Sequence, residues 1–233
     1  MFMRIAFTLL FGAAVMAQGA TPQDRAAAIK DLLAQNQARL RTYSWVETTT
    51  VTLKGEVKKQ EQKQCFYGAD GKVQKTPIGA APAAKPQASG GGGRGGRLKE
   101  KVVENKVDEM KDYMEKVAAL VHEYVPPAPA KIQAAQAAGN VSTQPAGATV
   151  NLAIKNYQKP GDLVTVGADP TAKRLTSYKV QSFVEKPKED DVSLNVTFGA
   201  LEDGTSYPQQ ILLDVTAKKI QVKITNSGYK KAG

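Results

Sequence analysis

The sequence predicts an α+β fold, a curved antiparallel sheet of about eight or nine strands that helices cover on one face. Between residues 98 and 124, apolar residues recur every three or four positions, which is typical of an amphipathic helix. After residue 148 they recur every second position in several short runs, which is typical of strands with one apolar face. Turn residues separate these runs and favour antiparallel hairpins.

Residues 1–19 (MFMRIAFTLLFGAAVMAQG) have the pattern of a secretory signal peptide. Arg4 precedes an apolar run of about twelve residues, too short to span a bilayer, which needs about 20. Small residues allow cleavage after Ala17 or Gly19, and no cysteine follows that could carry a lipid anchor. We predict a cleaved signal peptide, no transmembrane helix, and a periplasmic or secreted protein in which residues 20–233 form a single domain.

Residues 22–41 are helix-forming and can place several apolar side chains on one stripe. That stripe consists of Ala26, Ile29, Leu32, Leu33 and Leu40. The β-branched and aromatic residues of 42–78 follow, and hairpin signals at Lys54-Gly55 and Asp70-Gly71 divide them. Three short antiparallel strands are therefore predicted after the first helix.

Residues 79–97 are rich in alanine, proline and glycine and predict a disordered linker. A G-x-G-x-x-G pattern occurs within it, at Gly91, Gly93 and Gly96. A phosphate-binding loop needs a preceding strand, a lysine and a hydroxyl side chain, whereas this sequence has no strand, Arg97 and Leu98. An exported protein also does not meet cytosolic nucleotides or messenger RNA. We therefore expect neither nucleotide nor nucleic-acid binding.

Residues 98–124 form the most regular amphipathic segment of the sequence. Its apolar stripe consists of Val103, Val107, Met110, Met114, Val117, Val121 and Tyr124. Pro126-Pro127 must end this helix because proline has no N–H group and clashes with the preceding turn. A short alanine-rich helix over 130–138 is predicted next, and it ends at Gly139.

Five or six antiparallel strands are predicted from residue 148 onward. The alternation is clearest in residues 150–154, 192–198 and 220–224, where every second side chain is apolar. Turn signals separate the strands at 160–161, 169–170, 187–191, 203–204 and 216–219.

No catalytic or metal-binding pattern stands out. His122 is the single histidine, so the second histidine of a zinc-protease helix is missing, and a Ser-His-Asp triad would have to use His122 itself. The acidic residues of 185–191 alternate with lysines in a predicted turn and are typical of a solvated loop. We expect no enzymatic activity, no cofactor and no metal, although a hydrolase that uses convergent carboxylates stays an alternative. Cys65 is the single cysteine, which indicates a buried side chain or an intermolecular disulfide.

Two stretches, LRTYSWVETTTVTLKGE and LEDGTSYPQQILLDVTAKKIQVKITNSGYKK, resemble the periplasmic lipoprotein-carrier superfamily (LolA/LppX-like) or an exported relative of it. The order of signal peptide, first helix, strands, second helix and closing strands is similar too. The resemblance implies an unclosed antiparallel barrel with a helical lid over an apolar cavity for acyl chains. The insertion at 79–96 departs from that pattern.

We therefore predict a carrier or binder of lipid or lipid-modified protein that uses an apolar cavity between sheet and helices. The candidate cavity residues are Trp45, Met110, Met114, Val117, Val121, Leu194, Val196 and Phe198. The alternative is an exported structural or protein-interaction domain with a packed core and no ligand. A net charge of +10 predicts an anionic membrane surface as a further partner, and we expect a monomer.

Overall fold

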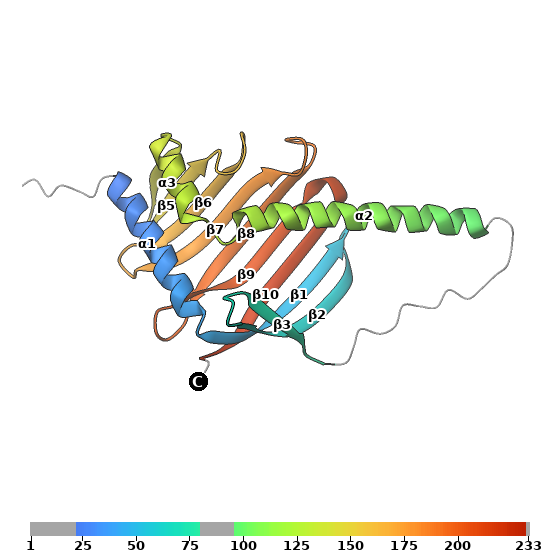
Figure 1. Cartoon of the computed structure of the whole chain (residues 1–233), viewed down its shortest axis with the longest axis horizontal. Helices are drawn as coiled ribbons and strands as arrows, with labels where there is room; N and C mark the ends of the chain where they lie inside the picture. Colours follow the sequence, from blue (N-terminus) through green and yellow to red (C-terminus); the bar gives the residue numbers. More distant parts are fainter. Residues whose placement is uncertain (1–21, 80–95, 232–233) are drawn as a thin grey trace, which may run out of the picture.

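The computed structural model describes residues 22–79 and 96–231 (Figure 1). The predicted signal peptide, 1–19, lies outside the described residues, as does most of the predicted linker. Residues 96 and 97, which were assigned to that linker, form the first turn of a helix instead.

Three helices are present in the described residues, and the sequence predicted all three. They are α1 (Pro22–Leu40), α2 (Gly96–Tyr124) and α3 (Pro129–Ala137). The strands are β1 (Tyr43–Leu53), β2 (Glu56–Tyr67), β3 (Val73–Pro77), β4 (Val141–Ala146), β5 (Thr149–Lys155), β6 (Leu163–Asp169), β7 (Arg174–Phe183), β8 (Asp191–Ala200), β9 (Ser206–Val215) and β10 (Ile220–Lys231). A 3-10 turn, η1 (Thr216–Lys218), connects the last two strands.

All ten strands form one antiparallel sheet in the order β3-β2-β1-β10-β9-β8-β7-β6-β5-β4. β3 and β4 are its two edges, so the sheet does not close into a barrel. This confirms the predicted fold class with one strand more than expected. The unexpected strand is β4 (VSTQPA), which lacks a clear alternation and contains Pro145. Proline removes a ladder hydrogen bond, and an edge strand tolerates that loss.

The pairing of β1 with β10 joins the two ends of the chain into this one sheet. The register places Leu53 opposite Ile220 and Val51 opposite Val222, so apolar side chains continue across the junction. Because cross-strand neighbours share a face, the alternation of both strands fixes which side of the sheet is apolar.

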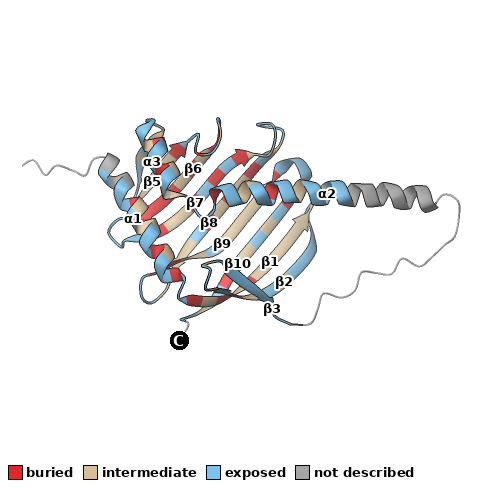
Figure 2. Cartoon of the chain, viewed as in Figure 1, coloured by how far each residue is buried: buried red, intermediate tan, exposed pale blue. Residues whose placement is uncertain are grey.

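One face of the sheet carries the core. On β8, Val192, Leu194 and Val196 are buried, while the intervening Ser193 and Asn195 are half-buried (Figure 2). Ile29 of α1, Tyr124 of α2 and Ile132 of α3 all belong to the same buried cluster as the inward side chains of β5 to β8. The three helices therefore lie over the same face (Figure 1).

The predicted helix stripes point to this core. Ile29 and Leu40 of α1 are buried, and Leu32 and Leu33 are half-buried. The side chain of Ala26 lies outside the described residues, as do those of Val103 and Val107 at the start of α2. The described part of the α2 stripe is buried or half-buried, and it consists of Met110, Met114, Val117, Val121 and Tyr124.

Candidate functional site

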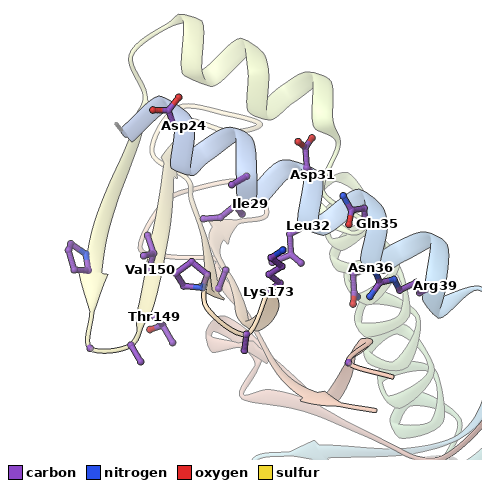
Figure 3. A pocket seen from close by; sticks show the side chains of 18 of the residues that line it. Asp24, Ile29, Asp31, Leu32, Gln35, Asn36, Arg39, Thr149, Val150 and Lys173 are labelled. Carbon is purple, nitrogen blue, oxygen red and sulfur yellow. The ribbon is translucent and has the colours of Figure 1, made fainter. Parts of the chain in front are cut away.

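A groove of about 850 Å³ lies between α1 and three connections of the sheet (Figure 3). The connections are the β4–β5 turn, the β6–β7 turn and the loop between β8 and β9. Its lining residues are Asp24, Ala28, Ile29, Asp31, Leu32, Gln35, Asn36, Arg39, Pro145, Gly147, Ala148, Thr149, Val150, Ala168, Pro170, Ala172, Lys173, Asp203 and Gly204.

One face of α1 forms the long wall of this groove. Ala28, Leu32, Gln35 and Arg39 follow one another at intervals of three or four residues, so they share that face. The helix segment from Asp24 to Arg39 is about 22 Å long at the usual rise of 1.5 Å per residue. The site is therefore elongated rather than round.

Small side chains leave the groove open. Ala28 on the helix faces turns that contribute Gly147, Ala148 and Ala172. None of these side chains is large enough to reach across, and Gly147 has a left-handed backbone with φ of 67° that glycine adopts without strain. The space exists because the residues that meet there lack the volume to fill it.

The floor is apolar. Ile29 and Ala168 are buried at the base of the groove, and the half-buried Leu32 and Val150 flank them. In Figure 3, Ile29 and Leu32 lie on the side of α1 that faces the sheet connections. An apolar surface of this kind favours a ligand with hydrocarbon character.

Two cations, Lys173 and Arg39, lie at the groove. Lys173 belongs to the β6–β7 turn and lies below Leu32 in Figure 3. Arg39 belongs to the last turn of α1, where a cation is favoured by the helix dipole. In the part of the chain that the structure describes, neither side chain forms an ion pair.

The acidic residues that line the groove do not pair with Lys173 or Arg39 in the described residues. Figure 3 shows Asp24 and Asp31 on the side of α1 away from Lys173. The carboxylate of Asp203 accepts hydrogen bonds from the Tyr43 hydroxyl at 2.7 Å and from the Thr205 backbone N–H at 2.9 Å. These bonds, the one from Tyr43 first, lower the pKa of Asp203 to about 2.

Asn36 fastens α1 to the sheet. Its side-chain amide donates to the Ser206 backbone oxygen at 2.7 Å and accepts from the Ser206 N–H, also at 2.7 Å. The Ser206 hydroxyl in turn accepts from the Leu175 N–H at 3.0 Å. All of these groups are buried, so each bond is costly to lose. Asn36 thereby fixes the polar end of the groove.

The C-terminal end of α2 packs closely against the sheet. A space of about 10 Å³ remains there, enough for about one water molecule. The residues around it are Leu120, Val121, Tyr124, Val180, Ser182, Val192 and Leu194. Val117, fully buried, packs in a neighbouring cluster with Val192, Val215 and Ile220.

A buried polar network locks the end of α2. The Tyr124 hydroxyl donates to the Asp162 carboxyl at 2.6 Å and lies 2.9 Å from the Ser182 hydroxyl. Burial, and then the bond to Asp162, raise the pKa of Tyr124. The Asp162 carboxyl also accepts three backbone N–H bonds of 2.6 to 3.0 Å, from Tyr157, Gln158 and Lys159. With its partners inside the protein, this carboxyl has a structural role.

The eight predicted cavity residues do not line the groove. Met110, Met114 and Val117 pack in the cluster at β8, β9 and β10, while Val121, Leu194, Val196 and Phe198 pack in the main core cluster. Trp45 is separate from them and stacks on the Tyr229 ring at 5.6 Å. Their role as ligand contacts stays a prediction.

Other sequence expectations concern surface and core groups. The 185–191 loop is charged and largely exposed as predicted, and Glu185 pairs with Lys116 of α2 at 2.7 Å. His122 is exposed. Cys65 is fully buried, and burial raises the pKa of its thiol.

Two structural patterns are absent from the described residues. They contain no group of three or more histidine, cysteine, aspartate or glutamate side chains that could hold a metal ion. No helix among them is both long and apolar enough to cross a membrane.

Sequence reasoning missed the groove. Its walls come from α1 and from turns that lie more than one hundred residues later in the chain. The available signal was the concentration of glycine, alanine and proline at those turns. Small residues in turns are ordinary, however, and only the fold shows that three such turns meet beneath one helix.

Comparisons with known proteins give weak structural similarity only, as one of the matching structures illustrates. No family model matches the sequence, and no curated protein matches it. A crystal structure of a LolA superfamily protein from Nitrosomonas europaea aligns at 9% sequence identity and a TM-score of 0.40, covering 91% of this chain and 94% of that chain. A similarity of this size does not assign the chain to that superfamily.

Proposed function

We propose that this protein is an exported binder or carrier of a lipid or lipid-modified protein, and that the hydrocarbon chain lies in the groove beneath α1. The observation that carries the proposal is the groove itself, about 850 Å³ with an apolar floor. Sites for small organic ligands range from about 300 to 1,000 Å³ and are mostly apolar. The groove is therefore of ligand size.

A binding role fits the chemistry of the groove better than a catalytic one. Nucleophilic or acid–base catalysis needs a reactive group beside a partner that activates it. The groove contains no histidine or cysteine, and its Asp203 has a lowered pKa that disfavours proton transfer near neutral pH. What the groove offers is shape, apolar surface and charge.

A second candidate function is a protein-interaction domain without a ligand. The packing of α2 against the sheet supports it. The interface there is filled, as a purely structural core would be. The open groove beneath α1 is the reason to prefer a binding function.

Titration with a fluorescent fatty acid tests the proposal. Ala28→Trp places a large ring in the groove, whereas Ala119→Trp makes the same change at an exposed position of α2. We expect the wild type and Ala119→Trp to bind the probe equally and Ala28→Trp to bind at least about tenfold more weakly. Equal binding by all three variants would contradict the groove as the site, and no binding by the wild type would favour the interaction domain.

Native mass spectrometry of the purified protein gives an independent reading. We expect an added mass in the range of a lipid in the wild type and its loss in Ala28→Trp. Salt-sensitive retention on anionic vesicles, absent on neutral ones, would support a membrane surface as the place of loading, as the net charge of +10 suggests.

A further inference from the structure

We infer that the groove selects a single-chain amphiphile with an anionic head, and that Lys173 and Arg39 receive this head. The inference rests on the proposed function and adds the ligand class and the direction in which the ligand lies. It derives from the uneven distribution of charge along the groove.

The two ends of the groove differ. The β4–β5 turn contributes small or apolar groups next to Ile29, among them Ala148 and Val150. The opposite end, at the last turn of α1, contributes Asn36 and Arg39. A hydrocarbon chain gains most by lying at the first end, since each buried CH₂ is worth about 0.8 kcal/mol. Its head then lies toward the second.

The cations of the groove, Arg39 at the second end and Lys173 below Leu32 in Figure 3, favour an anion. Lys173 and Arg39 form no ion pair within the described residues. Asp203, the acidic residue that the β8–β9 loop contributes to the groove, already accepts hydrogen bonds on both oxygens. Its charge is therefore partly balanced by Tyr43 and Thr205, whereas the two cations keep their hydrogen-bonding capacity for a ligand.

An anionic head would complete this arrangement. A carboxylate or phosphate monoester accepts charge-assisted hydrogen bonds from both lysine and arginine, and arginine can bind it with two parallel bonds. An uncharged head would leave the cations solvated and gain no such bonds. The chemistry required is an anionic oxygen group at the end of one hydrocarbon chain, as in a fatty acid or lysophosphatidate.

The experiment compares two probes that differ in this charge and by one methyl group. They are 11-(dansylamino)undecanoic acid and its methyl ester, titrated against the wild type, Lys173→Met, Arg39→Met and Lys179→Met. Lys179 is an exposed lysine on β7 that does not line the groove, so its variant has the same net charge as Lys173→Met. Changes in long-range attraction are therefore matched.

We expect the wild type and Lys179→Met to prefer the acid over the ester by about tenfold, the size of one charge-assisted hydrogen bond. Lys173→Met and Arg39→Met should each lose most of this preference while binding the ester as the wild type does. Equal binding of acid and ester by the wild type would overturn the inference and leave the proposed function intact. Binding of neither probe would overturn both.

Competition separates the two sources of such a head. Oleate that displaces the acid probe identifies a carboxylate ligand, and oleoyl lysophosphatidate that displaces it identifies a phosphate ligand. Displacement by either, reduced in Lys173→Met, supports the inference. Displacement by oleyl alcohol to the same extent would contradict it, because that molecule has the chain without the charge.

Discussion

α1 and α2 cover the same face of the sheet, yet the structure leaves a groove of about 850 Å³ beneath α1 and a space of about 10 Å³ at the C-terminal end of α2. The difference follows from side-chain volume. α2 presents Met114, Val117, Val121 and Tyr124 to a floor of valine and leucine. α1 presents Ala28 to turns that contribute mostly small residues, such as Gly147, Ala148 and Ala172. An apolar stripe predicts that a helix packs, whereas the size of the opposing residues decides whether space remains.

The attachment of the two helices differs as well. The end of α2 is held by large buried side chains and by the bond between Tyr124 and Asp162. α1 is held near its C-terminal end by the two hydrogen bonds of Asn36 and by the buried Ile29 and Leu40. Truncation of a side chain should therefore lower the free energy of unfolding strongly beneath α2 and only slightly along the groove.

The largest expected effect comes from Tyr124→Ala. Removing this buried ring should lower the free energy of unfolding by about 3 to 5 kcal/mol, because a cavity forms and Asp162 loses a donor. Leu32→Ala, on the groove wall, should cost about 1 kcal/mol because its side chain is only half-buried and faces existing space. Urea unfolding measures both, and equal losses would remove the distinction between the two regions.

Asn36→Ala should have the next largest effect. It leaves the buried N–H and C=O groups of Ser206 without partners, which we expect to cost about 1 to 3 kcal/mol. Gln35→Ala is the matched control at the neighbouring exposed position, and it should change stability by no more than about 0.5 kcal/mol. If thermal unfolding shows no difference between the variants, Asn36 does not hold α1.

Larger side chains should also destabilise the protein more beneath α2 than in the groove. Val121→Phe overfills the interface of α2 and should destabilise by about 1 to 3 kcal/mol. Ala28→Trp enters the groove and should change the free energy of unfolding by no more than about 0.5 kcal/mol. The unfolding midpoints of the two variants check this. A well-tolerated Val121→Phe would point to hidden volume beneath α2.

The smallest effect concerns pH at the rim of the groove. The pKa of Asp203 falls from an ordinary value of 3.8 to about 2 in the folded protein, so its ionised form contributes stability above pH 3.8. That contribution is lost as the pH falls through about 2. Asp203→Asn should therefore be slightly less stable than the wild type at pH 5 to 8, and this difference should shrink below pH 3.8. A difference that grows toward acid would contradict the assigned hydrogen bonds.

The sequence predicted most elements because each has a local cause. The stripe of α2 and the alternation of β8 follow from periodicity alone, and the β1–β2 turn follows from Lys54-Gly55, whose left-handed backbone matches a tight hairpin. The sequence did not predict β4 because an edge strand needs no alternation of apolar residues and tolerates Pro145. The antiparallel sheet was thus predictable to within one edge strand.

The candidate site was not predictable in the same way. The eight residues chosen from the sequence are apolar and central, and such residues fill space rather than leave it. The groove depends on the approach of Ala28, Gly147 and Ala172 across the fold. It also depends on Asn36 reaching Ser206, a pair separated by 170 positions. Neither contact has a local sequence signal.

Hydrogen–deuterium exchange with and without a saturating fluorescent fatty acid tests the central claim most directly, because it reports on both helices at once. The account predicts slower exchange in residues 28–39 of α1 and in the turns around residues 147–150 and 171–173, with no change in residues 110–121 of α2. Protection of 110–121 with α1 unchanged would place the ligand beneath α2 and contradict the groove as the binding site.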